Sequence, residues 1–240
     1  MIVCKGLAKQ LVPIVAIILA VLSVGACTST GNESDKPKNT SSAKSVLNYK
    51  KADQDYQKLV LQLKNNRPSP QMFDAIVRIY PLTAKYDPYD GIEQAQKLVA
   101  NNAMDTGNWQ QCLSATNAIL NDNFTSLTGH YGAMVCHLES GNTSQGRYHK
   151  RMLDGFMDAV WRSGSGQTLA SALYVTSAND LYAFIQLQNH IAVGQKLVYL
   201  DDKPIHAMSV KNLQNQSEKI WYFDVTAQFR RGILDVIEQR

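Results

Sequence analysis

Apolar residues recur at three- and four-residue steps from about residue 46 to 162, which is the period of amphipathic helices. The first stripe runs from Tyr49 to Leu63, and Pro68 follows it. Ser69 and Pro70 are typical of the start of the next helix. In the third helix the stripe consists of Ile92, Ala95, Leu98, Val99 and Ala103. The pattern predicts six helices, with stripes over 49–63, 72–80, 92–103, 109–120, 127–138 and 148–160.

Two Gly-Asn dipeptides, at 107–108 and 141–142, separate consecutive predicted helices, and they lie 141 − 107 = 34 residues apart. This is the period of tetratricopeptide repeats, in which pairs of antiparallel helices stack on one another. We therefore expect tetratricopeptide-like helix pairs over 46–162. An ordinary helical bundle with a coincidental spacing is the alternative.

The pattern changes after Ser163-Gly164-Ser165-Gly166, where alternation typical of strands begins. Strands are predicted at 173–176, 195–200, 205–211 and 219–226, with a short helix at 179–188 and a C-terminal helix at 228–239. Short connections between the last three strands favour an antiparallel meander. The predicted fold class is α+β: the helix pairs, then a small antiparallel sheet with a covering helix over 163–240.

The N-terminal residues have the pattern of an export signal. Lys5 and Lys9 precede an apolar run from Leu11 to Val24, which is too short for a membrane span. Val24-Gly25-Ala26-Cys27 resembles the lipobox of bacterial lipoproteins. The resemblance implies that residues 1–26 are removed and that Cys27 receives a diacylglyceryl group and a palmitate-type acyl chain. An ordinary secretory signal is the alternative.

The segment 27–45 contains Ser, Thr, Asn, Lys, Gly and Pro with almost no apolar residues, as expected for a flexible tether behind the lipid. Thr28 rather than Asp follows Cys27, which by the lipobox resemblance favours the outer membrane facing the periplasm. The expected membrane attachment is through the lipid on Cys27.

The composition, charge and motifs of the chain exclude several classes of function. The chain has a net charge of +4 and 45% hydrophobic residues, typical of a globular protein and too weakly basic to indicate nucleic-acid binding. No nucleophile elbow, phosphate-binding loop or HExxH motif is present in the sequence. We therefore expect no catalytic residue and no cofactor.

Cys112 and Cys136 would remain in the exported protein, and they lie on consecutive helices. A helical hairpin that turns near residue 124 brings them opposite each other, because (112 + 136)/2 = 124. In an oxidising compartment this pairing predicts a disulfide. Two buried free thiols are the alternative.

Five histidines occur, at positions 130, 137, 149, 190 and 206. Zinc requires three or four converging ligands, and the spacing of these histidines does not supply them. We expect surface or helix-capping histidines and no metal site.

The segment Tyr86-Asp87-Pro88-Tyr89-Asp90 lies between two predicted helices. Its two tyrosines and two carboxylates, Tyr86, Asp87, Tyr89 and Asp90, are candidates for gripping a ligand or a calcium ion. The alternative is a rigid connector whose tyrosines pack on the helices.

Several of these pieces resemble a family of bacterial exported proteins catalogued as domain of unknown function 4919. The matching residues are Ile79-Tyr80, Tyr86-Asp87-Pro88-Tyr89, Ser163-Gly164-Ser165-Gly166, Asp180-Leu181-Tyr182, Gly194–Val198 and Tyr222-Phe223-Asp224-Val225. Two positions depart from the family pattern: Ser165 replaces an Asp, and Leu181 separates Asp180 from Tyr182. The resemblance, over about 49–229, implies the fold and export but no chemistry.

The leading functional prediction is a membrane-anchored scaffold that binds an envelope protein or peptide in a groove of the third to sixth helices. Asn101, Asn102, Asn117 and Tyr131 are the candidate groove residues. The alternative is a hydrolase-like envelope enzyme with its site between the helices and the sheet, using Asp180, Tyr182, His206 and Asp224. A purely structural envelope component is a third possibility.

Overall fold

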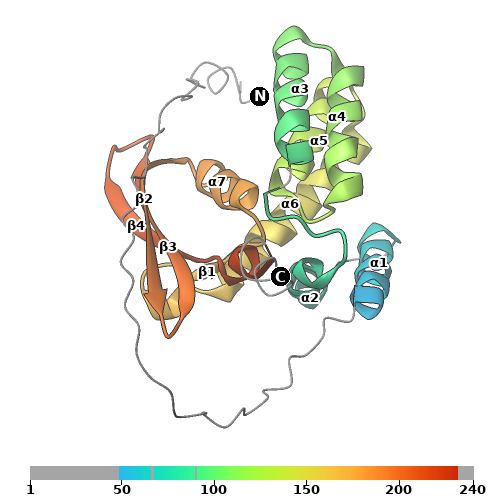
Figure 1. Cartoon of the computed structure of the whole chain (residues 1–240). Coiled ribbons are helices and arrows are strands. Elements are labelled where there is room, and N and C mark those ends of the chain that lie inside the picture. The colour runs from blue at the N-terminus through green and yellow to red at the C-terminus, as the bar shows by residue number, and fades with distance from the viewer. Residues whose placement is uncertain (1–48, 66–67, 90, 232–240) are drawn as a thin grey trace, which may run out of the picture. The chain divides into compact units, whose positions relative to one another are not determined.

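The computed structural model describes residues 49–65, 68–89 and 91–231. These residues belong to one compact unit, Leu47–Arg240 (Figure 1). The predicted signal, Cys27 and the tether lie outside the described residues, as does most of the predicted C-terminal helix. None of the described helices is long and apolar enough to cross a membrane.

All six helices predicted before residue 163 form in the described part of the chain. Between α2 and α3 the chain adds one turn of 3-10 helix at Tyr80–Leu82. The helices are α1 (Tyr49–Asn65), α2 (Pro70–Ile79), α3 (Gly91–Thr106), α4 (Trp109–Asp122), α5 (Leu127–Glu139) and α6 (Thr143–Ser163). Helices α3 to α6 pack against one another in chain order (Figure 1).

The two Gly-Asn turns have the same structure, 34 residues apart. Gly107 and Gly141 adopt φ of +70° and +82°, a region that costs glycine little and other residues more. The side chains of Asn108 and Asn142 each cap the following helix by accepting a backbone N–H three residues on. Their own N–H groups donate back to the carbonyls of Ala103 and His137. The repeated turn explains why α3–α4 and α5–α6 are both antiparallel hairpins.

The buried face of α3 differs from the predicted stripe. Glu93, Ala100 and Ala103 are buried, whereas Ile92 and Leu98 are more than half exposed. Helix α3 is the first of the four packed helices, and its strongest contacts are with α4 and α5. The apolar surface of α3 is wider than the area that α4 and α5 cover. Periodicity alone therefore does not predict which part of this surface is buried.

A four-stranded sheet follows the helices, in the order β1-β4-β3-β2. The elements are β1 (Leu173–Tyr174), α7 (Ala178–Leu187), β2 (His190–Leu200), β3 (Lys203–Asn212), β4 (Glu218–Asp224) and α8 (Thr226–Phe229), with a 3-10 turn at Leu169–Ser171 before β1. Strands β2, β3 and β4 form the predicted antiparallel meander. The α+β fold class is therefore confirmed.

One pairing is not antiparallel, because β1 runs parallel to β4, with Leu173 opposite Phe223. Short connections enforce antiparallel pairing only between strands that follow each other directly. Strands β1 and β4 are separated by α7 and the whole β2–β3 hairpin, so the length of their connection does not enforce antiparallel pairing.

Strand β2 begins at His190, five residues before the predicted start at Gln195. The register with β3 shifts between Ala192 and Gly194, which leaves Val193 as a bulge. A bulge interrupts the two-residue alternation, so this half of the strand does not show the strand pattern. At the other end, Asp201 and Asp202 both have positive φ and form the two-residue turn into β3.

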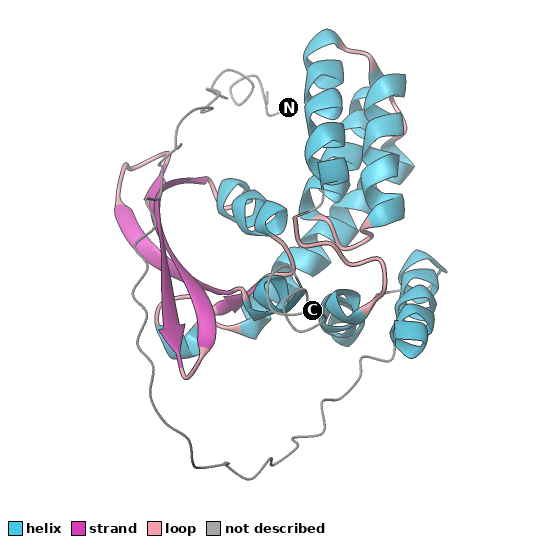
Figure 2. Ribbon diagram, in the orientation of Figure 1, coloured by secondary structure: helices cyan, strands magenta, loops and turns pink. Residues whose placement is uncertain are grey.

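The main hydrophobic core includes residues of both the helices and the sheet. Phe184 of α7 packs on Trp221 and Phe223 of β4, and Trp161 of α6 also contacts Phe184 and Trp221. Helix α7 thus covers one face of the sheet, as Figure 2 shows. The sheet and the helices therefore share one core, and buried polar residues such as Asp180 lie at their junction.

Candidate functional site

Asp180 lies in the first turn of α7 and is buried where the helices meet the sheet region. Its Oδ1 accepts the backbone N–H of Leu127 at 3.0 Å, and its Oδ2 accepts the hydroxyl of Thr176 at 2.7 Å. Its own N–H donates to the Ser177 side chain, which caps α7. Asp180 therefore joins the N-terminus of α5 to the N-terminus of α7.

Glu93, a second buried carboxyl, approaches the same end of α5 from α3. The hydroxyl of Ser126 donates to Glu93 Oε1 at 3.1 Å and accepts the N–H of Gly129 as the cap of α5. A helix N-terminus favours negative charge because its first N–H groups lack partners within the helix. The start of α5 is thus held by two carboxyls that come from α3 and α7.

Burial, and after it the nearby carboxyl of Asp180, together raise the pKa of Glu93 to about 8. Burial also raises the pKa of Asp180, against the hydrogen bonds from Leu127, Thr176 and Ser177. Two carboxyls in one buried site resist being ionised together. The pair therefore keeps a proton at neutral pH.

A small cavity of about 20 Å³ adjoins Asp180, lined also by Thr125, Tyr174 and Thr176 and by apolar side chains of α2 and α6. A volume of this size holds one water molecule, whereas ligand pockets are about 300–1,000 Å³. A larger depression lies on the surface of α1, but residues of that single helix form all of its lining. The cavity beside Asp180 is therefore too small for a substrate.

Among the predicted loop residues, Tyr86 belongs to the joint around Asp180. Its hydroxyl donates to the carbonyl oxygen of Thr176 at 2.5 Å, and its ring packs edge-on against Tyr80. Burial raises the pKa of both tyrosines. These contacts favour the rigid-connector interpretation of this segment at Tyr86.

The other candidate residues of this loop do not come together in one site among the described residues. Asp87 accepts the N–H of Tyr89, the ring of Tyr89 is exposed, and Asp90 lies outside the described residues. Within the described ranges, no group of three or more His, Cys, Asp or Glu side chains is arranged to hold a metal ion.

The four residues suspected for an enzyme are divided between three places. The Tyr182 hydroxyl donates to Gln195 Oε1 at 2.7 Å, and Gln195 Nε2 lies 3.0 Å from His206 Nδ1. Asp224 accepts the N–H of Thr226 at the start of α8. Asp180 bonds instead to α5, so Tyr182 and His206 come together through Gln195 without a carboxylate.

The candidate groove residues lie on three successive helices. Asn101 and Asn102 are near the end of α3, Asn117 is on α4 and Tyr131 is on α5. Asn101 is half-buried and the other three are exposed. The side chains of Asn102, Asn117 and Tyr131 are therefore accessible from solvent.

Three of the five histidines, His130, His149 and His190, contradict the prediction of surface or capping positions. His130 and His149 are buried, with their Nδ1 atoms 3.1 Å apart, and His137 stacks on His149. His130 Nε2 is 2.9 Å from the carbonyl oxygen of Phe124, so it donates there, and its Nδ1 accepts from His149. His190 is buried as well.

Burial lowers the pKa of His130 to about 3 and that of His149 to about 4, so both rings are neutral at pH 7. The sequence contained a signal for this cluster. Reflecting position 149 about the turn at Gly141 gives 282 − 149 = 133, which lies between His130 and His137. Reflection about the turn, as for the cysteines, thus predicts that His149 lies beside the other two histidines.

Cys112 and Cys136 form a disulfide between α4 and α5, with Cα atoms 6.0 Å apart. Both are fully buried beside Ala103 of α3. The predicted disulfide is confirmed.

The comparisons with known proteins agree with the resemblance drawn from the motifs. A family model described as "Domain of unknown function (DUF4919)" matches residues 41–231. The chain belongs to this family. No curated protein and no solved structure matches the chain. The description of DUF4919 names no activity.

The Ser-Gly-x-Gly motif of this DUF4919 chain connects α6 to the sheet. The Ser163 hydroxyl donates to the Val160 carbonyl and accepts the N–H of Tyr174, and the Gly166 carbonyl accepts the N–H of Tyr222. Gly166 has φ of +69°, and a Cβ on Gly164 would come within 2.4 Å of the Ser171 carbonyl oxygen. The two glycines are needed for this turn.

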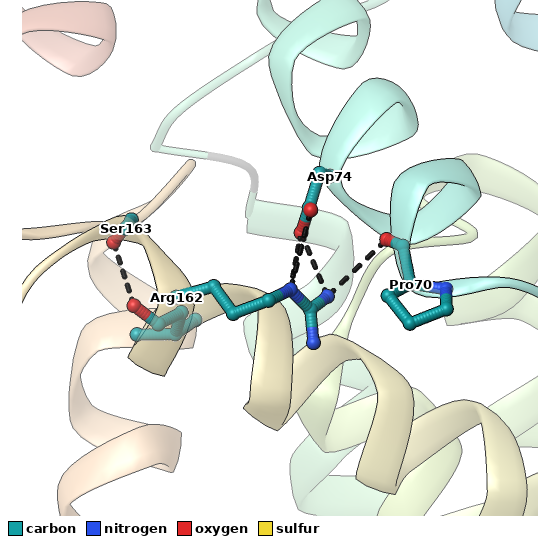
Figure 3. Close-up of polar contacts among 5 residues, drawn as sticks. Pro70, Asp74, Arg162 and Ser163 are labelled. Atoms are coloured by element: carbon teal, nitrogen blue, oxygen red, sulfur yellow. Dashed lines mark hydrogen bonds and ion pairs between the residues drawn. The ribbon is translucent and has the colours of Figure 1, made fainter.

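The positions that depart from the DUF4919 pattern have structural roles. The Ser165 hydroxyl accepts the N–H of Gln167, a turn contact that a carboxylate can also make, and the side chain of Leu181 is fully buried. Arg162, next to the turn, donates to both carboxylate oxygens of Asp74 and to the carbonyl of Pro70 (Figure 3). Arg162 therefore attaches the end of α6 to α2, and Ser163 and Gly166 attach it to the sheet.

Proposed function

We propose that this DUF4919 chain is a lipid-anchored protein of the bacterial cell envelope that binds an extended segment of another envelope protein and catalyses no reaction. The observation that carries the proposal is the joint at Asp180. Its carboxylate oxygens accept bonds from Leu127 and Thr176 beside a cavity of about 20 Å³, which is too small for a substrate. This favours a binding protein over the hydrolase-like alternative.

The helical hairpins supply the surface for the partner. Helices α3 and α5 are the first helices of the two hairpins, and they contact each other. In stacked helix pairs, the first helices line the concave side that receives peptides. Leu98 on α3 is 62% exposed and Tyr131 on α5 is 38% exposed. They are 131 − 98 = 33 residues apart, close to the 34-residue repeat, so they occupy similar levels of the two hairpins.

The anchor is the lipid that the lipobox-like Val24–Cys27 implies. A lipid on Cys27 followed by a polar segment of about 18 residues would hold the folded unit roughly 25 Å from the membrane. Two or more acyl chains give stable attachment, whereas one does not. Thr28 favours the outer membrane, with the protein facing the periplasm.

The anchor is tested by metabolic labelling with an alkyne fatty acid in the native host. We expect label and membrane association in the unchanged chain, and loss of both in Cys27→Ala. Cys112→Ala is the matched control, since it removes a cysteine without touching the lipobox. Equal labelling of unchanged and Cys27→Ala chains would contradict the anchor.

The binding surface is tested by crosslinking in intact cells followed by purification of the lipidated chain. We expect one envelope protein in near-equal amount, lost in the double variant Leu98→Glu, Tyr131→Glu. Leu61→Glu on α1 is the control, because Leu61, at 59%, is about as exposed as Leu98 but lies on another helix. A partner retained by the double variant would refute this surface.

A further inference from the structure

Strand β2 forms an edge of the sheet, and among the described residues no strand pairs with its outer side. Four of its large apolar side chains are exposed: Ile191, Val193, Leu197 and Tyr199. Soluble proteins usually protect such an edge with charges, bulges or covering segments, because its free backbone groups pair readily with another strand. This edge has one charged residue, Lys196, and the bulge at Val193.

The bulge and the turn limit the segment that can pair. The register with β3 shifts between Ala192 and Gly194, and the turn at Asp201 and Asp202 ends the strand. The regular, uncovered segment is therefore Gln195–Tyr199, and Leu197 is its centre.

The hydrogen-bonding pattern of the β2–β3 hairpin decides which backbone groups face outward. In a hairpin with a two-residue turn, the residues flanking the turn, here Leu200 and Lys203, bond to each other, and bonded pairs then alternate along the ladder. Residues 200, 198 and 196 direct their N–H and C=O groups to β3. Gln195, Leu197 and Tyr199 therefore direct theirs to the outside.

These three residues also share the face of the sheet on which α7 packs, since the Gln195 side chain bonds to Tyr182 of α7. Leu197 is 37% exposed and Tyr199 is 59% exposed beside it. The outward backbone groups and the uncovered apolar side chains thus belong to the same residues.

The segment is complementary to itself when two copies run antiparallel about an axis at Leu197. Leu197 then faces Leu197 of a second copy, and Gln195 faces Tyr199, so every bonded pair joins two outward-facing residues. Lys196 faces Val198, so no two lysines stand directly opposite. A pairing centred on residue 196 would place the two Lys196 side chains directly opposite each other, and one centred on residue 198 would place Gln195 opposite Asp201, which lies in the turn.

We infer that the β2 edge is a homodimer interface, in which Gln195–Tyr199 of two copies pair antiparallel about Leu197 to join the two sheets. The contact is isologous and closes on itself. It uses β2 rather than α3 and α5, so it is independent of the proposed binding of a partner and of the lipid anchor.

The register is tested with single added cysteines in the full chain. In the dimer, the Cα atoms of the two 197 residues would lie about 5.5 Å apart, within the range of a disulfide. The two 199 residues would be about four residues of strand apart, roughly 14 Å. Mild oxidation of Leu197→Cys should give a disulfide-linked dimer at least about tenfold faster than oxidation of Tyr199→Cys. Both variants keep the native cysteines, which therefore cancel in the comparison.

Assembly itself is tested by sedimentation equilibrium of the full chain at about 1–100 μM, since an interface of this small size is expected to bind in the micromolar range. Leu197→Lys places two ammonium groups opposite each other and should weaken the dimer at least about tenfold. Leu61→Lys, on α1, should leave it unchanged. Both sites are on the surface, so folding is checked by matching thermal denaturation.

Three results would overturn the inference: a monomer throughout this concentration range, equal crosslinking rates at positions 197 and 199, or a dimer that Leu197→Lys leaves intact. A dimer that is lost only in the Leu98→Glu, Tyr131→Glu variant would move the interface to α3 and α5 and would equally reject β2.

Discussion

Replacing Asp180 with alanine should destabilise the protein strongly, because the carboxylate is the acceptor for two buried donors. The N–H of Leu127 and the hydroxyl of Thr176 both donate to it. A buried donor left without an acceptor costs about 1–3 kcal/mol. Two such donors give a loss of about 2–6 kcal/mol, a large share of the about 5–15 kcal/mol that stabilises a typical domain.

Asp180→Asn is the informative control for this prediction. Its carbonyl oxygen still accepts from Leu127, and its amide can donate to the Thr176 hydroxyl once that group rotates. Asparagine keeps the size of the side chain and one acceptor oxygen, and it introduces no unpaired buried charge. We expect a loss of about 1 kcal/mol, the usual net value of one altered hydrogen bond.

The assay is urea denaturation followed by far-ultraviolet circular dichroism, with the free energy of unfolding taken from variants that have the same m-value. The proposed role predicts a large loss for alanine and a small one for asparagine. If Asp180→Ala lies within about 1 kcal/mol of the unchanged protein, or if asparagine costs as much as alanine, the joint is not what holds α5 to α7.

Three further predictions concern stability. Replacing Cys112 and Cys136 together with alanine should cost about 3.5 kcal/mol in the chain-entropy treatment of a loop of about 25 residues, measured as the shift in urea midpoint against the oxidised protein. Because folding lowers the pKa of His130 to about 3 and that of His149 to about 4, the unfolded chain binds more protons below pH 6.5. The stability that they contribute should fall from pH 6.5 towards pH 4, and a His149→Phe variant should show a shallower fall. Glu93 has the opposite sign, since its raised pKa of about 8 gives stability that is complete below pH 4.5 and lost as the pH rises through 8. Glu93→Gln should remove that alkaline loss, and an unchanged pH profile would contradict the buried carboxyl.

The helical half was readable from local signals. Amphipathic periodicity located the six helices, and the repeated Gly-Asn turns fixed which of them pair. The cysteine spacing then predicted the Cys112–Cys136 disulfide by simple reflection about a turn. Each of these inferences depends on residues close in the chain or on one known turn, so no long-range information was needed.

The predictions from the sequence were wrong where a residue or strand packs against a segment that is distant in the chain. Helix α3 buries Glu93 rather than Leu98 because α5 and α7 supply Ser126 and Asp180 around that carboxyl, and periodicity counts only apolar residues. The parallel pairing of β1 with β4 brings together strands separated by most of the C-terminal region.

Periodicity, turn chemistry and motif spacing are local properties of the chain, and they were enough to predict the α+β class, the helix hairpins, the disulfide and the DUF4919 resemblance. The meeting of Asp180 and Glu93 at the start of α5, the burial of His130 with His149 and the position of β2 at the edge of the sheet became visible only in the folded chain. Burial, pKa and exposure depend on which distant elements cover a residue, and that is set by the packing of the whole chain.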